Sequence, residues 1–282
     1  MAFSKALSQI PSFCWYILFP RCPTIYDVSV DNIPISVLPP PPEANDQCSN
    51  ADDDQIAINS SYWLMLIMAV EVLSQKRTKL EEFSAFLWKM IAVGEFNRTD
   101  KFCRLGIVVD GRTRLINGDE NQAKLIEPYF GNVLSIPFGE KKIEELKERP
   151  LSWIANEIHE LLESAVTKEH FLGLIDWVEA HRPEPCLAKI YCSGASEEEP
   201  AVVVSSGQHF PVKKMNFGWG EPCFGSYHFP WGGKSGYVMP MPSPKGNGDW
   251  IVYMHLLKGR LELIETNAAN VFSPLTCQNI FA

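Results

Sequence analysis

The chain has 282 residues, and its 25 Lys and Arg against 34 Asp and Glu give a formal net charge of −9. Hydrophobic residues make up 46% and charged residues 21%, which is typical of a soluble globular protein and too apolar for a wholly disordered one. The negative charge and the lack of a Lys/Arg cluster argue against binding of nucleic acid through its phosphates.

The first quarter of the chain combines an apolar start, a proline-rich stretch and a short apolar run. Residues 1–23 form an atypical apolar leader interrupted by Pro11 and Pro20, so we expect no signal peptide and a cytoplasmic location. Residues 24–54 contain four consecutive prolines and end in three aspartates, which predicts an extended linker. The apolar run 62–70 is too short to span a membrane and predicts a buried helix. Eight cysteines without a CxxC pair predict reduced thiols.

The rest of the chain alternates helical and strand periodicity. Apolar residues three and four positions apart predict amphipathic helices at 80–93, 151–166 and 261–272. Short apolar runs bounded by turn residues predict strands at 105–109, 186–192 and 201–204, and a hairpin at 235–255 with its turn at 246–249. The alternation predicts an α/β fold with mixed sheets flanked by helices.

Two local patterns imitate known motifs but lack essential residues. Gly233-Lys234-Ser235 is similar to the end of a phosphate-binding loop, but His228 replaces the first glycine and no helix is predicted to follow. His159 begins HELLE, half of a zinc-protease motif whose second histidine is replaced by Glu163. We therefore expect an ion pair on a helix surface and no metal site.

Residues 216–236 interleave glycines with aromatic rings. Glycine permits positive φ and close backbone approach, while the rings supply bulk without flexible stems. This composition fits either a tight turn between strands or the wall of a ligand channel, and by itself it favours the turn.

Five segments occur in the order found in one known family. Asn216-Phe217-Gly218-Trp219-Gly220 resembles the DFGWG signature of plant BAHD acyl-CoA-dependent acyltransferases. The segments that resemble the other landmarks of that family are Ser84-Ala85-Phe86-Leu87-Trp88, Asp110-Gly111-Arg112, Tyr129-Phe130-Gly131-Asn132 and Ser205-Ser206. The resemblance covers roughly residues 24–282.

The resemblance implies a two-lobed, chloramphenicol-acetyltransferase-like fold with a tunnel between the lobes. Acyl-CoA would be the co-substrate, an alcohol or amine of plant secondary metabolism the acceptor, and no bound cofactor would be needed. Residues 55–282 would form the second-lobe region, with 213–240 contacting the first lobe, and the protein would be a monomer without a membrane span. The resemblance implies a structural role for residues 216–220. The resemblance also implies that six residues lie on the CoA side or line the channel, and packing is the alternative role for each. They are Ser84, Ala85, Trp88, Asp110, Arg112 and Asn132.

The sequence departs from the family pattern twice. No HxxxD motif is present, and the nearest match, His159 with Glu163, follows the GN segment. The family places its catalytic histidine well before the helix that corresponds to Ser84-Ala85-Phe86-Leu87-Trp88. The resemblance therefore implies an N-terminally truncated member that lacks most of its first lobe, with residues 24–54 as its remnant and linker, and that is inactive alone. The alternatives are a non-catalytic binding relative, a partial gene product, or an enzyme using His209 or His228 as its base. In the second departure, Asn216 replaces the signature aspartate, which removes a charge.

Overall fold

The computed structural model describes residues 14–18, 61–68, 77–95, 101–116, 118–126, 128–181, 190, 199–210, 214–218, 220, 222, 224–228 and 235–275. The predicted linker 24–54 and Trp219 lie outside these residues, as do most of the leader 1–23 and all of the predicted strand 186–192 except Ile190. Among the described residues, none of the helices combines the length and the apolar content that crossing a bilayer requires.

A seven-stranded mixed sheet forms the centre of the molecule, with the strand order β11-β2-β10-β9-β7-β3-β6. Its three parallel strands are β3 (Phe102–Ile107), β7 (Ala201–Val204) and β9 (Gly236–Pro242). The antiparallel strands on either side are β6 (Phe138–Lys142), β10 (Trp250–Leu257), β2 (Ser61–Met68) and β11 (Phe272–Pro274). The mixed sheet predicted from the sequence is thus confirmed.

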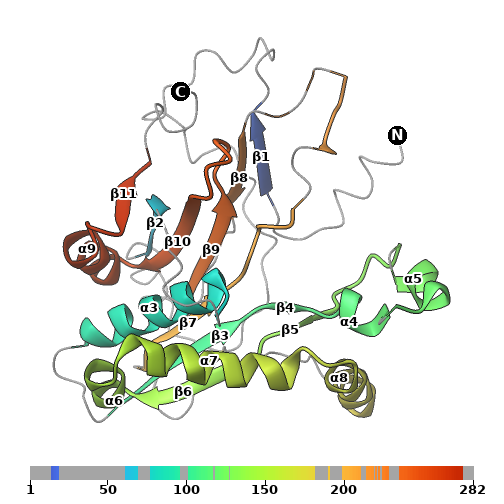
Figure 1. The fold of residues 1–282 in the computed structure, drawn as a ribbon, viewed down its shortest axis with the longest axis horizontal. Coiled ribbons are helices and arrows are strands. Elements are labelled where there is room, and N and C mark those ends of the chain that lie inside the picture. The colour runs from blue at the N-terminus through green and yellow to red at the C-terminus, as the bar shows by residue number, and fades with distance from the viewer. Residues whose placement is uncertain are drawn as a thin grey trace, which may run out of the picture.

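Four helices pack on one face of this sheet (Figure 1). They are α3 (Lys79–Val93), α6 (Ile143–Glu148), α7 (Leu151–Ala165) and α9 (Lys258–Asn267). Because side chains alternate between the faces of a strand, Val202 and Val204 join the helix-covered core while Val203 lies in a separate cluster on the opposite face. The main core therefore lies between the sheet and these helices.

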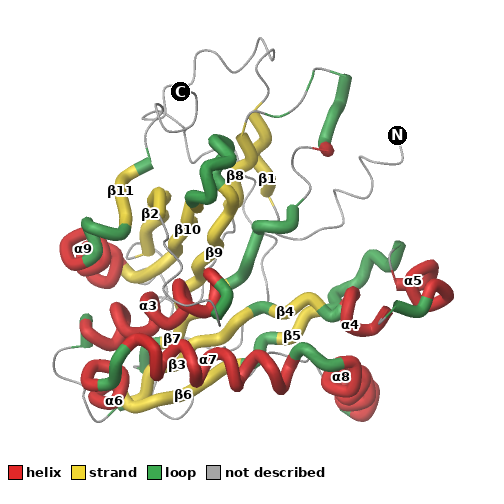
Figure 2. Tube along the Cα trace, viewed as in Figure 1, coloured by secondary structure: helices red, strands yellow, loops and turns green. Residues whose placement is uncertain are grey.

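A smaller unit, which we call the arm, continues from the end of β3. It consists of β4 (Val109–Asp110), α4 (Arg112–Ile116), α5 (Glu120–Ile126), β5 (Leu134–Ser135) and α8 (Lys168–Ala180). Strand β4 pairs with β5, and α4, α5 and α8 lie at one end of the molecule (Figure 2). The core of the arm has three buried residues, Val109, Leu115 and Phe171. Elsewhere, β1 (Cys14–Leu18) pairs with β8 (Phe224–His228) in a separate two-stranded sheet.

Most of the predicted elements that lie in described residues are confirmed. Helices 80–93 and 151–166 correspond to α3 and α7, strand 201–204 to β7, and the hairpin 235–255 to β9 and β10. The predicted strand 105–109 begins three residues earlier, as β3, and breaks before β4. Glu81 and Glu82 in the first turn of α3 are buried, although they carry charges.

Two predictions were wrong. Residues 61–68 form strand β2 rather than a helix, and β2 pairs with β10 along its whole length. A short apolar run does not distinguish a buried helix from a central strand, which is covered on both faces. The last predicted helix, 261–272, ends at Asn267, and Phe272 pairs with β2 in β11. Thr266 and Asn267 both have low helix propensity, which favours this earlier end.

Candidate functional site

Trp88 and Ala85, from the segment Ser84-Ala85-Phe86-Leu87-Trp88, lie in the main core. The Trp88 side chain is 1% exposed, and its indole Nε1 donates to the carbonyl oxygen of Cys103 at 3.3 Å. A Cβ added at Gly139 would lie 2.9 Å from the Trp88 ring, so β6 approaches the indole closely because it has glycine there. Trp88 therefore joins α3 to β3 and β6.

Ser84 is the polar residue of the same segment, and it is also fully buried. Its hydroxyl oxygen has no hydrogen-bond partner among the described residues. Helix α3 itself begins at a capping box, in which Thr78 accepts from the amide of Glu81 and the Glu81 carboxylate accepts from the amide of Thr78. Ser84, Ala85 and Trp88 are at most 1% exposed, so in this structure all three are packed inside the main core.

Arg112 brings together two of the other predicted segments. Its Nη1 lies 3.2 Å from Oδ1 of Asp110, and the same oxygen accepts from the backbone amide of Arg112 at 3.0 Å. Its Nη2 donates to the carbonyl oxygens of Gly131 at 2.8 Å and Tyr129 at 3.5 Å. One guanidinium thus connects the end of β4 to a turn seventeen to nineteen residues later. We call Asp110, Arg112 and the turn 129–132 the arginine clamp.

The turn of the arginine clamp is fixed at its C-terminal end. The amide of Gly111 donates to the carbonyl oxygen of Val133 at 2.8 Å, and Asn132 Oδ1 accepts from the amide of Leu134 at 3.1 Å. The Tyr129 ring covers Gly131, where an added Cβ would lie 2.1 Å from ring atoms. Glycine is therefore required at 131 for this packing.

The surface of the arginine clamp is both polar and apolar. The Arg112 side chain is 31% exposed and that of Asp110 54% exposed. Tyr129 and Phe130 are 54% and 76% exposed. Such a surface can bind a ligand through a planar cation and through aromatic rings. It holds no candidate general base other than the Asp110 carboxylate, which already accepts two hydrogen bonds.

The signature-like segment forms a tight turn in its described part. Oδ1 of Asn216 accepts from the amide of Gly218 at 2.8 Å, an Asx-turn. Gly218 and Gly220 have φ of 92° and 108°, a conformation that favours glycine. Asn216 is exposed, and Phe217 is 53% exposed. This geometry agrees with the tight-turn interpretation for the beginning of the segment 216–236, whereas Phe224–His228 within that segment form the strand β8. Trp219 lies outside the described residues.

His159 lies between two carboxylates, as predicted for a helix-surface ion pair. Its Nδ1 is 2.7 Å from Oε1 of Glu81 on α3, and its Nε2 is 3.2 Å from Oε1 of Glu163 one turn along α7. Burial alone raises the pKa of Glu81, but hydrogen bonds from Thr78 and His159 outweigh it, so the pKa of Glu81 lies below its ordinary value. The described residues contain no group of three His, Cys, Asp or Glu arranged to hold a metal ion.

The remaining titratable candidates are not assembled into a catalytic site in the described part of the chain. His209 is exposed, and the side chain of His228 lies outside the described residues. Cys103 is fully buried, and this burial raises the pKa of its thiol to about 12, so it is not a nucleophile at neutral pH. The strand β9 begins at Gly236, directly after Gly233-Lys234-Ser235, which confirms that no phosphate-binding helix follows.

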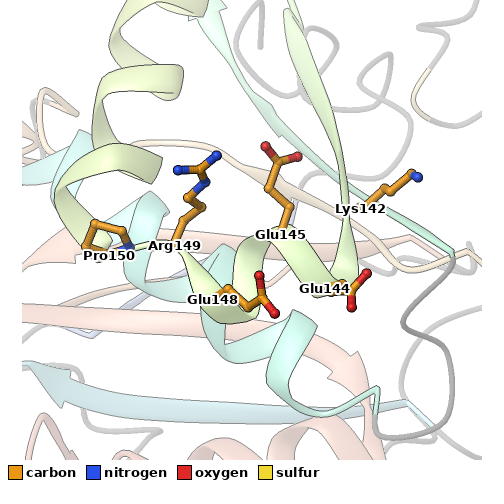
Figure 3. Close-up of a pocket in the computed structure, with 6 residues that line it drawn as sticks. All are labelled: Lys142, Glu144, Glu145, Glu148, Arg149 and Pro150. Atoms are coloured by element: carbon orange, nitrogen blue, oxygen red, sulfur yellow. The ribbon is translucent and has the colours of Figure 1, made fainter.

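Figure 3 shows an open surface pocket at α6. Its lining residues are Lys142, Glu144, Glu145, Glu148, Arg149 and Pro150. The amine of Lys89 donates to the carbonyl oxygens of Leu146 and Lys147 at the end of α6 and of Arg149 beyond it. Because the lining is of mixed charge and includes none of the five segments, we do not assign a function to it.

Sequence reasoning missed one pair near the arginine clamp. Ser135 follows the GN segment in β5, and its Oγ lies 2.8 Å from Nε2 of His170 in the first turn of α8. Thirty-five residues separate the two, so no local spacing signals the contact.

Comparisons with known proteins agree with this fold. A model of the Transferase family matches residues 50–271. Anthranilate N-benzoyltransferase protein 1 of Dianthus caryophyllus is 27% identical over 195 residues, which cover 67% of this chain and 41% of that protein. Omega-hydroxypalmitate O-feruloyl transferase of Arabidopsis thaliana is 26% identical over 151 residues, which cover 54% of this chain and 29% of that protein.

Solved structures show the same fold. F. graminearum TRI101 complexed with coenzyme A and deoxynivalenol has a TM-score of 0.59 at 16% identity, and vinorine synthase has a TM-score of 0.51 at 13% identity. Each match covers 76% of this chain and 49% of the solved chain. This chain thus spans about half the length of the solved chains and less than half that of the curated relatives. Because the family model matches most of this chain, the chain belongs to the Transferase family, that of the BAHD acyl-CoA-dependent acyltransferases.

Proposed function

We propose that this chain carries the part of a BAHD-type acyltransferase that binds the acyl-CoA thioester, for transfer of its acyl group to an alcohol or amine. The observation that supports this most directly is the arginine clamp, in which two separate family-like segments meet at an exposed surface. Family membership over residues 50–271 and the coenzyme A bound in the similar TRI101 structures give the ligand class.

The names of the relatives suggest which thioesters to examine first. Relatives named as benzoyl-, feruloyl- and hydroxycinnamoyltransferases point to an aromatic acyl group. Anthranilate and putrescine are amines, and omega-hydroxypalmitate is an alcohol, so both acceptor classes are represented. Exposed aromatic rings at Tyr129 and Phe130 suit an apolar aromatic group.

Attack of an alcohol or amine on a thioester requires removal of a proton from the acceptor. The 282 residues contain no HxxxD, and His159 is already held between Glu81 and Glu163. A missing general base typically slows such a reaction about 10²–10⁴-fold. We therefore propose that these residues bind the thioester but transfer the acyl group poorly by themselves.

The same considerations favour a second candidate function, a non-catalytic relative that binds acyl-CoA. The lack of HxxxD is the observation behind it. Our other proposals are that residues 55–282 correspond to the second lobe of the family fold, that 213–240 face the first lobe, and that the protein is a cytoplasmic monomer.

Calorimetric titration of the purified chain tests thioester binding. Benzoyl-CoA, feruloyl-CoA and acetyl-CoA are titrated in turn, with Arg112→Ala as the probe and Arg114→Ala as the matched control, since Arg114 is an exposed arginine on the same helix. We expect saturable binding that is about tenfold weaker in Arg112→Ala, as for loss of one good charged contact. Absence of binding, or equal loss in the two variants, would contradict the proposal.

Release of free CoA in the presence of an amine or alcohol then separates the two candidate functions. Binding without acceptor-dependent release favours the non-catalytic relative, because the thioester is held but not consumed. Acceptor-dependent release at a rate close to that of complete relatives would show that another group in this chain acts as the base.

A further inference from the structure

The first turn of α8 contacts the segments that carry the arginine clamp from the side of the arm core. His170 and Phe171 lie side by side in this turn, with their rings 5.3 Å apart in an edge-to-face arrangement. The turn is fixed by its N-cap, because the side chain of Thr167 accepts from the amide of His170 at 3.2 Å. Both rings therefore project from a well-defined helix start.

Phe171 packs directly against the backbone of Gly111, the residue between Asp110 and Arg112. A Cβ at Gly111 would lie 2.3 Å from a carbon of the Phe171 ring, so the ring fills the space that a side chain would need. Phe171 is 3% exposed and belongs to the same cluster as Val109 and Leu115. Gly111 does not have a positive φ, so its backbone conformation allows alanine, and the nearest atoms that an alanine Cβ would meet all belong to this ring.

His170 makes the second contact, on the opposite strand. Its Nε2 lies 2.8 Å from Oγ of Ser135, which is 7% exposed and pairs with Val109 across the β4–β5 ladder. Ser135 follows Leu134, whose amide binds the side chain of Asn132. The helix thus contacts the segment of Asp110 and Arg112 at Gly111, and the strand β5 that follows the turn 129–132 at Ser135.

We infer that His170 and Phe171 are positioning residues of the arginine clamp: through Ser135 and Gly111 they set the relative position of Arg112 and the turn 129–132. Neither residue needs to touch a ligand for this role. The inference rests on the proposed function in one respect, the identity of the ligand that the arginine clamp binds. The positioning itself can be measured without a ligand.

Substitution of Gly111 tests the Phe171 contact. In Gly111→Ala the new methyl group meets the ring, so we expect amide hydrogen exchange across residues 129–133 to become about tenfold faster, as is typical of coupled neighbours. Gly173→Ala is the matched control, because a Cβ at Gly173 meets nothing within 4 Å. In the double variant Gly111→Ala/Phe171→Ala the clash is absent. The increase in its exchange rate should therefore be smaller than the product of the increases in the two single variants. An increase in exchange rate equal to that product would overturn the inference.

Substitution of His170 tests the second contact without burying or removing a core side chain. His170→Ala loses the bond to Ser135, whereas His170→Gln retains an amide group in about the place of Nε2. We expect faster exchange at 129–133 in the alanine variant, restoration in the glutamine variant, and no change in the exchange of α3. Equal exchange in all three proteins, or equal acceleration in α3, would overturn the inference.

Thioester affinity provides the second readout. If the clamp binds acyl-CoA, affinity should fall in His170→Ala and recover in His170→Gln. Loss of exchange protection in a chain that binds no thioester would contradict the proposed function and leave the positioning role standing. Thioester binding with unaltered exchange and affinity in every variant would overturn the positioning role and leave the proposed function standing.

Discussion

Trp88 and Arg112 both lie in segments that resemble family motifs, but their surroundings are opposite. Trp88 is 1% exposed in the main core, with its indole between α3, β3 and the glycine of β6. Arg112 is part of the arm, whose own core has only three buried residues, and its side chain is 31% exposed. Large apolar side chains such as Phe130 and Leu125 are exposed in the arm.

Trp88 and Arg112 thus illustrate two different reasons why a residue belongs to a motif. A buried side chain such as Trp88 is constrained by packing and acts through the fold. A partly exposed guanidinium with fixed partners is constrained by geometry and is still accessible to a ligand. The motif alone does not separate residues that build the scaffold from candidates for contact with the substrate. The burial of each side chain does separate them.

The largest expected effect is on stability in the main core. Trp88→Ala removes the indole from a site that is sealed on all sides, so the free energy of unfolding should fall by about 3–5 kcal/mol. Trp177→Ala is the control, because Trp177 is 47% exposed on α8, and its cost should stay near 0.5 kcal/mol. Denaturant unfolding followed by circular dichroism measures both. Equal losses of unfolding free energy in the two variants would contradict the distinction between the main core and the arm.

The buried carboxylate of α3 gives the next largest effect. Glu81→Ala breaks the capping box and the contact with His159, which should cost about 1–3 kcal/mol at neutral pH. Because the folded-state pKa of Glu81 lies below its ordinary value of 4.5, its stabilisation is complete above that pH and is lost as the pH falls below it. The difference in unfolding free energy between the two proteins should thus shrink from pH 6 to pH 3. A constant difference would contradict this assignment.

The fold was more predictable from the sequence than the site. Long amphipathic patterns identified α3 and α7, and the turn at 246–249 identified the hairpin of β9 and β10. The run that became β2 was misassigned, because its apolar character comes from its place between two other strands.

The site depended on contacts between residues distant in sequence. The segments of Asp110 and Gly131 were both identified, but only the structure shows that Arg112 joins them. The contact between Ser135 and His170 has no local signal at all. Burial of Glu81 has no signal in the sequence, because a carboxylate is usually exposed and one of its partners, His159, lies on another helix.

In the arm, removal of the guanidinium should have a small effect on global stability. Arg112→Ala should lower the free energy of unfolding by about 1 kcal/mol or less, because the side chain is partly solvated. Arg112→Lys keeps the charge but loses the fork that reaches Asp110 and Gly131 together, so it should resemble the alanine variant in thioester affinity. Unfolding curves and titrations of both variants measure this. A loss as large as that of Trp88→Ala would make the clamp a scaffold element.

The smallest expected effect is at the signature turn. Asn216→Asp restores the aspartate of the family signature, and its carboxylate can accept from the amide of Gly218 as the asparagine does. The change in unfolding free energy should stay within about 0.5 kcal/mol. Stabilisation well beyond this value would reveal a cationic partner for position 216.

Amide hydrogen exchange with and without a saturating acyl-CoA thioester tests the central claim most directly, because it reports on both regions in one measurement. The account predicts added protection at residues 109–112 and 129–135 of the arm. Exchange at residues 83–91 of α3 should not change, since these side chains act through packing. Added protection in α3 without any in the arm, or no added protection in either region, would contradict the account.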